Sequence, residues 1–188
     1  MPGRLIASSI CSVDGYTVDA GGSFAWAAPD PDVHAYVNEC ERPIGTYLYG
    51  RKMYDTLKVW QTMEGDAPEI RDFADLWRAA DKVVYSTTLA EPETPKTRIE
   101  RTFEPEVVRA LKAAADRDLT IGGPTLAASA FRAGLVDEVQ LFLIPIAVGG
   151  GTPALPAGVR VDLRLEEERR FAGGTMFLRY AVVGGAAA

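Results

Sequence analysis

Histidine and cysteine are scarce in this chain of 188 residues, which contains one histidine, His34, and two cysteines, Cys11 and Cys40. A structural zinc site needs about four such ligands at short spacings, so we predict no metal site. A single imidazole with no nucleophile placed beside it by spacing gives no basis for Ser-His-Asp or Cys-His catalysis. We expect His34 on a helix surface. Two isolated cysteines favour reduced thiols in the cytoplasm over a disulfide.

Long apolar runs and an excess of positive charge are also absent. No stretch approaches the roughly 20 apolar residues of a membrane span, and the first residues, MPGRLI, lack the apolar segment of a signal peptide. The 20 Lys and Arg residues are outnumbered by 26 Asp and Glu, which disfavours a nucleic-acid partner because phosphate binding needs concentrated cations. A small anionic ligand is compatible, since a few cations and backbone N–H groups can hold one. We therefore expect a cytoplasmic protein with a small-molecule substrate, away from membranes.

Strand and helix signals alternate along most of the chain, and 47% hydrophobic residues are enough for a substantial core. This order predicts one three-layer α/β domain over residues 1–188, with helices on both faces of a mixed, mostly parallel sheet. The last two strands, joined at residues 172–174, indicate an antiparallel hairpin. The predicted strands are 4–13, 46–49, 82–86, 97–100, 118–121, 137–146, 160–171 and 175–183, and the predicted helices are 31–41, 69–80, 103–116 and 124–133.

Two adjacent glycines, Gly122 and Gly123, end a predicted strand and precede Pro124, which suits the first turn of a helix. In an open α/β sheet, ligands bind beyond the carboxyl ends of the strands. The unpaired N–H groups and the dipole of a helix that begins there suit a phosphate, and glycine lets the phosphate approach the backbone. The pattern alone fits a phosphate site and a tight structural turn equally well.

Two other segments combine a strand end with residues that favour ligands. Gly50, Arg51 and Lys52 follow a strand and open a helical turn, so the two cations would suit a phosphate ester; solvation of a surface is the alternative. Three glycines at 149–151 follow the strand 137–146. They permit close contact with a ligand, or they form a mobile loop.

Three side chains near the first long loop are candidates for the substrate side. Asp14 and Asp32 are possible proton donors, because a carboxyl beside an apolar cleft can donate when burial raises its pKa. The alternatives are a β-turn for Asp14 and helix capping for Asp32. Trp26 suits a position in the core or in a pocket wall.

Five motifs occur in an order that resembles the dihydrofolate-reductase-like superfamily. Within it, the chain looks most like the C-terminal reductase domain of the bacterial bifunctional riboflavin deaminase–reductase and its stand-alone relatives. No zinc deaminase sequence precedes the motifs, so we expect a stand-alone relative. The resemblance runs from about residue 4 to residue 183, which we take as the core of the reductase domain. The motifs are IASSICSVDG (6–15), YLYGRKMY (47–54) with Trp60, TIGGPTL (120–126), GLVDE (134–138) and PIAVGGG (145–151).

The resemblance implies an eight-stranded sheet that binds NADPH. The glycine pair would contact the pyrophosphate, with an unusual cis peptide bond between the glycines as one possibility. The segment 50–52 would hold the diphosphate and the adenosine 2′-phosphate, and the end of strand 82–86 would contact the adenosine. The residues expected to contact NADPH are Gly50, Arg51, Lys52, Ser86, Thr87, Gly122, Gly123, Pro124 and Thr125.

The resemblance also implies hydride transfer from NADPH to a small heterocycle, of either the ribosylaminopyrimidine type used in riboflavin biosynthesis or the pterin and dihydrofolate type. Asp32 lies near the acidic residue that anchors the pterin in dihydrofolate reductases, so either Asp32 or water would supply the proton. Asp14, Trp26 and Gly150 are the residues expected on the substrate side. The alternative function is a non-catalytic or regulatory NADPH-binding protein on the same scaffold. Relatives of this kind are commonly homodimers, and we expect one here.

Overall fold

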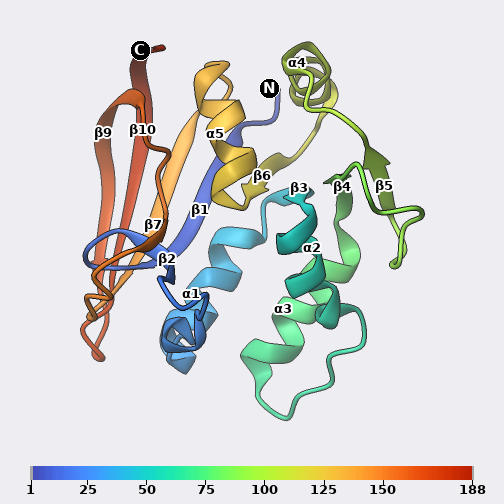
Figure 1. Ribbon diagram of the computed structural model, residues 1–188. Coiled ribbons are helices and arrows are strands. Elements are labelled where there is room, and N and C mark those ends of the chain that lie inside the picture. Colours follow the sequence, from blue (N-terminus) through green and yellow to red (C-terminus); the bar gives the residue numbers. More distant parts are fainter. Residues whose placement is uncertain (1, 188) are drawn as a thin grey trace.

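The computed structural model describes residues 2–187 (Figure 1). Its main sheet has eight strands in the order β5-β4-β3-β6-β1-β7-β10-β9. In that order the strands are β5 (Thr97–Glu100), β4 (Asp81–Tyr85), β3 (Ile44–Gly50), β6 (Asp118–Gly122), β1 (Leu5–Ser12), β7 (Glu138–Ile144), β10 (Met176–Ala187) and β9 (Val159–Arg170). The α-helices are α1 (Pro31–Glu41), α2 (Arg51–Leu57), α3 (Pro68–Ala79), α4 (Pro105–Ala114) and α5 (Pro124–Arg132).

The mixed sheet and its terminal hairpin confirm the predicted fold class. Neighbouring strands from β5 to β7 are parallel, whereas β10 and β9 are antiparallel and close one edge. Two elements are shorter than predicted because proline limits them. β7 ends before Pro145, which has no N–H for the ladder. α4 begins at Pro105, since the residue before a proline disfavours the helical conformation.

A second, two-stranded sheet was not predicted. β2 (Tyr16–Asp19) pairs with β8 (Gly151–Pro153) in antiparallel fashion. β8 consists of glycine, threonine and proline, which have little strand propensity together, and it forms only where β2 offers it a partner. A side chain at Gly151 would overlap the carbonyl oxygen of Val18. The last of the three glycines is therefore required by the close approach of β2.

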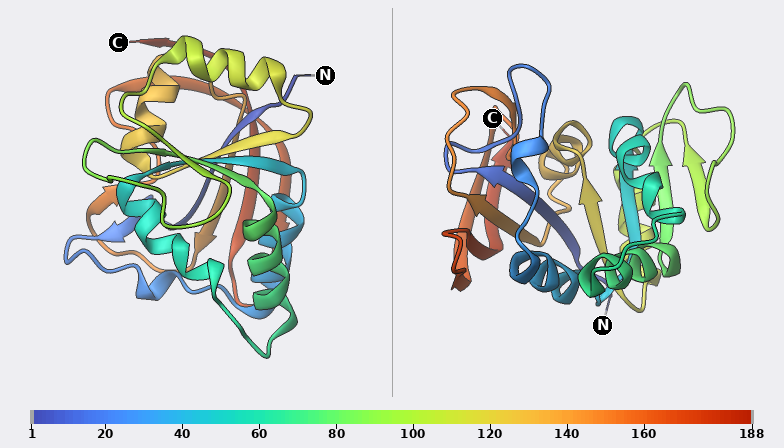
Figure 2. Two further views of the ribbon diagram at one scale, coloured as in Figure 1. Left: turned by 90° about the vertical axis from the view of Figure 1, so that its right-hand side faces the viewer. Right: turned by 90° about the horizontal axis from the view of Figure 1, so that it is seen from below.

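Side chains that alternate along the strands divide between two cores, one on each face of the sheet. Leu5 and Leu48 pack with α4 and α5 on one face, whereas Ile6 and Tyr47 pack with α2 and α3 on the other. α1 covers this second face near β7 and β10, where Val33 and Tyr36 meet three phenylalanines, Phe142, Phe171 and Phe177. The resulting three layers can be followed in Figure 2.

The parallel strands end at one common edge of the sheet. Tyr49 on β3 pairs with Gly122 on β6, and Gly50 pairs with Tyr85 on β4. Each predicted ligand segment begins where one of these strands ends. The strand order therefore brings together segments that lie more than 30 residues apart in the sequence.

Candidate functional site

The amino ends of α2 and α5 lie side by side at this edge, because β3 and β6 are paired up to Tyr49 and Gly122. A methyl group at Gly50 would meet only the Cβ atom of Leu126 on α5, at 4.0 Å. Neither helix has a side-chain hydrogen bond at its N-cap, which is Gly50 for α2 and Gly123 for α5. Two uncapped helix ends present free N–H groups and two positive dipole ends at one place, which favours an anion.

Gly122 and Gly123 are glycines for two different reasons. A Cβ atom at Gly122 would lie 3.1 Å from two ring carbons of Tyr49 and 3.2 Å from Cγ of Met53. Gly122 is thus buried against its own chain, which agrees with the structural-turn alternative. Gly123 has a φ of 95° and is half-buried, and a Cβ atom there would meet only Met53, at 3.7 Å. The open space at the amino end of α5 therefore lies beside Gly123 and not beside Gly122.

The cis peptide bond considered for the glycine pair is not found, since residues 2–187 contain none. Beyond Gly123, Pro124 is half-buried and Thr125 is exposed in the first turn of α5. The amino end of this helix is therefore open to solvent.

The two cations predicted as phosphate ligands have different surroundings. The Nε atom of Arg51 donates to Oδ2 of Asp55 at 2.6 Å, and this hydrogen bond is the main cause of the lowered pKa of Asp55. The ammonium of Lys52 has no hydrogen bond or ion pair to any described residue, and its side chain is exposed. Lys52 is therefore the cation at this helix end that a ligand can bind without displacing a carboxylate.

Sequence reasoning missed the residues that pair with Arg51. Glu93, from the loop between β4 and β5, lies with its Oε1 atom 3.7 Å from Nη2 of Arg51. Lys58 contacts both Asp55 and Glu93. The spacing of Arg51 and Asp55, one helical turn apart, was a readable signal. The approach of Glu93 was not, because it depends on how the loop folds back.

Ser86 and Thr87 follow β4, next to the end of β3. The Ser86 hydroxyl accepts hydrogen bonds from the backbone N–H groups of Leu89, at 3.0 Å, and Thr88, at 3.3 Å. Arg101 donates to the carbonyl oxygens of Ser86 and Leu89, which fixes the turn. Ser86 is buried and shapes the turn, whereas Thr87 is exposed and available to a ligand.

Asp14 connects the turn after β1 to the glycine segment after β7. Its carboxylate accepts hydrogen bonds from the backbone N–H groups of Val148, at 3.1 Å, and Gly149, at 2.7 Å. The Ser12 side chain and the Gly149 N–H group lower the pKa of Asp14. An ionised carboxylate held in this way positions the glycine segment, and its lowered pKa makes it unsuited to proton donation.

The other residues predicted on the substrate side lie in separate segments. Asp32 is exposed in the first turn of α1, where its Oδ1 atom accepts from the N–H of Val33 at 2.9 Å. Trp26 lies in a short 3-10 helix, Ala25–Ala27, and its indole N–H donates to the carbonyl of Ser23 at 3.1 Å. Gly150 has a φ of 154° and nothing within 4 Å of a Cβ position. No hydrogen bond or ion pair among the described residues joins these three.

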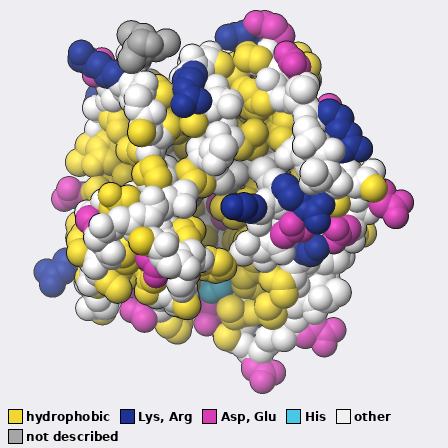
Figure 3. All heavy atoms as spheres, viewed as in Figure 1, with side chains coloured by type: hydrophobic (Ala, Val, Ile, Leu, Met, Phe, Trp, Pro, Cys, Tyr) yellow, Lys and Arg dark blue, Asp and Glu magenta, His cyan; other side chains and the backbone are white. Residues whose placement is uncertain are grey.

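His34 lies on α1 as predicted and is half-buried, because it packs in an aromatic cluster between α1, α3 and the 3-10 helix Lys58–Gln61. Its ring centre lies 6.0 Å from that of Trp60 and 5.8 Å from that of Phe73. Burial lowers the pKa of His34. Figure 3 shows part of the histidine, the cyan side chain, at the surface beside hydrophobic side chains. The cluster gives this face an aromatic wall.

The sequence of this chain matches a known protein family. Residues 4–177 match the sequence model of the RibD C-terminal domain family. The chain belongs to this family. It is also 28% identical over 181 residues to the uncharacterized protein YyaP of Bacillus subtilis (strain 168), a match that covers 94% of each chain.

Solved structures share the fold of this RibD C-terminal domain at low sequence identity. A putative riboflavin biosynthesis protein from Shewanella sp. PV-4 has a TM-score of 0.72 at 19% identity, over 98% of this chain and 100% of that one. A pyrimidine reductase-like protein from Corynebacterium diphtheriae has a TM-score of 0.71 at 15% identity, over 97% and 92%. RibD of Acinetobacter baumannii has a TM-score of 0.71 at 14% identity, over 97% of this chain and 58% of that one. These matches confirm the dihydrofolate-reductase-like fold.

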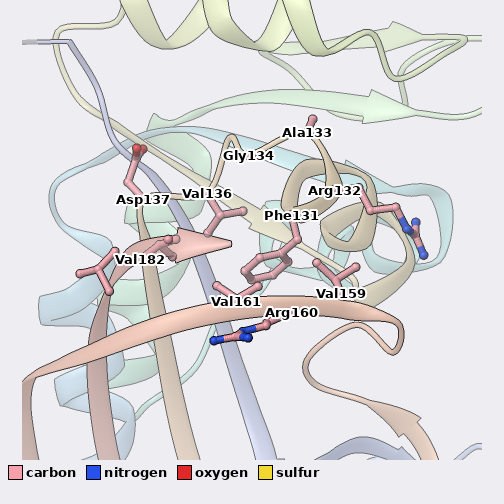
Figure 4. Close-up of a pocket in the computed structure, with 12 residues that line it drawn as sticks. Phe131, Arg132, Ala133, Gly134, Val136, Asp137, Val159, Arg160, Val161 and Val182 are labelled. Carbon is pink, nitrogen blue, oxygen red and sulfur yellow. The ribbon is translucent and has the colours of Figure 1, made fainter. Parts of the chain in front are cut away.

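A large hollow of this RibD C-terminal domain, of about 570 Å³, lies at the opposite edge of the sheet (Figure 4). It is bounded by the last turn of α5 and the open end of the β9–β10 hairpin, with Phe131, Val161 and Val182 among its apolar side chains. It contains none of the predicted site residues. Among residues 2–187, no helix is long and apolar enough to cross a membrane, and no group of three or more His, Cys, Asp or Glu could hold a metal ion.

Proposed function

We propose that the chain is an NADPH-dependent reductase, with one catalytic domain over residues 4–183, that transfers a hydride to a small heterocycle. The observation that carries this proposal is the pair of uncapped helix ends beside the unpaired Lys52. Strands lie about 4.8 Å apart, so the edge from β4 through β3 and β6 to β1 is about 14 Å long, enough to support an extended dinucleotide. The names of the Shewanella and Corynebacterium proteins favour a ribosylaminopyrimidine substrate over a pterin.

NADPH, when bound, supplies the hydride, and the side chains of this protein orient the two reactants. The N–H groups at the amino ends of α2 and α5 bind the diphosphate, with Lys52 adding a positive charge. Asp14 holds the glycine segment beside the end of β1. The wall of His34, Trp60 and Phe73 gives a flat ring an aromatic surface to lie on. Asp32 or a water molecule supplies the proton to the reduced atom.

Titration of the native protein with NADPH and NADH, followed through the fluorescence of its three tryptophans, tests cofactor binding. We expect tighter binding of NADPH, because its 2′-phosphate adds negative charge near Arg51 and Lys52. Arg51→Ala and Lys52→Ala should each narrow the difference. Arg132→Ala, which removes a cation at the far edge of the sheet, serves as the control and should leave both affinities unchanged. Absence of binding by either dinucleotide would refute the proposal.

The non-catalytic alternative is favoured by one observation. Asp32, the candidate proton donor, is exposed to solvent, and its carboxylate accepts a hydrogen bond from the N–H of the next residue of its own helix. Oxidation of NADPH in the presence of a ribosylaminopyrimidine or a dihydropterin separates the two functions. Steady turnover supports the reductase, whereas NADPH binding without turnover of either substrate type supports the alternative.

We also propose that the protein forms a homodimer through the surface made by α5 and β9. β7 is an inner strand of the sheet, so its edges are paired and do not form an interface. Three apolar side chains on this side of the molecule are exposed: Val183 lines the hollow in Figure 4, Leu155 lines a smaller hollow with Phe131, and Leu165 lies on β9. Apolar side chains grouped on one face favour a protein partner.

A further inference from the structure

Four charged side chains form a closed network beside the amino end of α2. Arg51 and Lys58 each contact both Asp55 and Glu93. The distances are 2.6 Å from Arg51 to Asp55, 3.7 Å from Arg51 to Glu93, 3.2 Å from Lys58 to Asp55 and 2.5 Å from Lys58 to Glu93. All four side chains are between 35% and 38% exposed. The network is therefore reachable from solvent and has no net charge.

The loop that carries Glu93 is fixed to α2 by a buried contact. The backbone N–H of Glu93 donates to the hydroxyl of Tyr54 at 3.1 Å, and the same hydroxyl lies 2.9 Å from the hydroxyl of Thr94. Tyr54 is fully buried. Because the backbone beside it is held in this way, Glu93 faces Arg51 at little further cost in conformational entropy.

The position of the network matches the adenosine side of the proposed cofactor. Gly50 pairs with Tyr85, so Arg51 and Thr87 lie at adjacent strand ends. One strand, β6, lies between β3, which Arg51 follows, and β1, near which the hydride would be transferred. A phosphate on the 2′ position of the adenosine ribose would thus approach Arg51 while Asp55 and Glu93 compete for the same guanidinium.

We infer that Glu93, with Asp55, sets the preference between NADPH and NADH by occupying Arg51. This inference depends on the proposed function, because it concerns the same dinucleotide site. A 2′-phosphate carries nearly two negative charges, whereas a 2′-hydroxyl carries none. Competition from the two carboxylates weakens the binding of NADPH but not of NADH. The native protein therefore binds NADPH only slightly more tightly than NADH.

The test is a titration of native protein, Glu93→Gln and Glu91→Gln with NADPH and with NADH at low ionic strength. Glu91 lies in the same loop, is exposed and forms no ion pair with any described residue, so its variant controls for the loss of one negative charge. Glu93→Gln should bind NADPH about tenfold more tightly than native protein, with NADH changed less than about twofold. The gain should shrink as salt is added, because the charges are exposed.

A double variant identifies the cation involved. In an Arg51→Ala background, Glu93→Gln should improve NADPH binding no more than Glu91→Gln does. The ratio of NADPH affinity to NADH affinity can be compared between native protein and Glu93→Gln. If both proteins bind both cofactors and this ratio is the same in the two, the inference is overturned and the proposed function stands. Binding of neither cofactor by native protein would overturn both.

Discussion

Three glycines around α5 are required for different structural reasons. Gly122 makes room for Tyr49 and Met53, whereas Gly123 and Gly134 have positive φ angles of 95° and 62° at the two ends of the helix. Gly134 lies at the edge of the sheet away from the candidate site, with nothing within 4 Å of a Cβ position. Gly123 and Gly134 therefore form a matched pair for mutation. Both have a positive φ, but only Gly123 lies at the candidate site.

Gly123→Ala and Gly134→Ala should each lower the free energy of unfolding by about 1–2 kcal/mol, because alanine resists a positive φ. Only Gly123→Ala should also weaken NADPH binding, since it alters the N–H groups at the amino end of α5. Thermal unfolding and the fluorescence titration measure the two effects. If Gly134→Ala weakens NADPH binding as much as Gly123→Ala does, the loss of binding comes from general destabilisation and not from the helix end.

At the scale of elements, α1 ends on a buried carboxyl group between itself and β3. The Oε2 atom of Glu41 and the hydroxyl of Tyr47 are buried, and neither has a hydrogen-bond partner among the described residues. Burial raises the pKa of Glu41 to about 7, from an ordinary value of 4.5, and a weaker interaction with Tyr47 offsets part of this shift. The packing of α1 on the sheet therefore favours the protonated form of Glu41.

This raised pKa predicts that stability falls as the pH rises. From about pH 4.5 to about pH 7 the unfolded chain loses the Glu41 proton while the folded chain keeps it, so the folded state binds more protons over this range. The loss amounts to about 3 kcal/mol, at about 1.4 kcal/mol for each pKa unit. Glu41→Gln, which cannot ionise, should be more stable than native protein at about pH 8 by that amount and no more stable at about pH 4. Urea unfolding at the two pH values measures the free energy of unfolding of both proteins. If the difference in stability between Glu41→Gln and native protein is the same at both pH values, the raised pKa of Glu41 is contradicted.

At the scale of the whole molecule, the two edges of the sheet have different roles. The ligand segments gather at the carboxyl ends of the parallel strands, while three exposed apolar side chains, Leu155, Leu165 and Val183, lie on or next to the β9–β10 hairpin. If the chain is a homodimer, sedimentation should give twice the chain mass of 20.3 kDa. Leu165→Lys should shift it to the monomer by placing a charge in the interface. Val107→Lys is the matched control, because Val107 on α4 and Leu165 are both 47% exposed. A native protein that sediments as a monomer would exclude the dimer.

The sequence alone predicted most of the secondary structure and the segments of the candidate site. Alternation of apolar residues and the prolines at helix starts gave α1, α3, α4 and α5 to within two residues at each end. β8 could not be predicted, because its pairing with β2 joins segments more than 130 residues apart. The pairing of Glu93 with Arg51 and the packing of His34 against Trp60 and Phe73 were missed for the same reason. Each depends on a distant partner.

What the sequence determined by itself is local. Chain stiffness, apolar periodicity and glycine placement act over a few residues, and they defined the strands, the helices and the strand-to-helix junctions. The tertiary structure alone decided which junctions meet. The order β3-β6 brings Gly50 beside Gly123 and gives one site two helix dipoles. It also decided the charge of that site, because a carboxylate from another loop neutralises Arg51, and Coulomb forces depend on distance in space rather than along the chain.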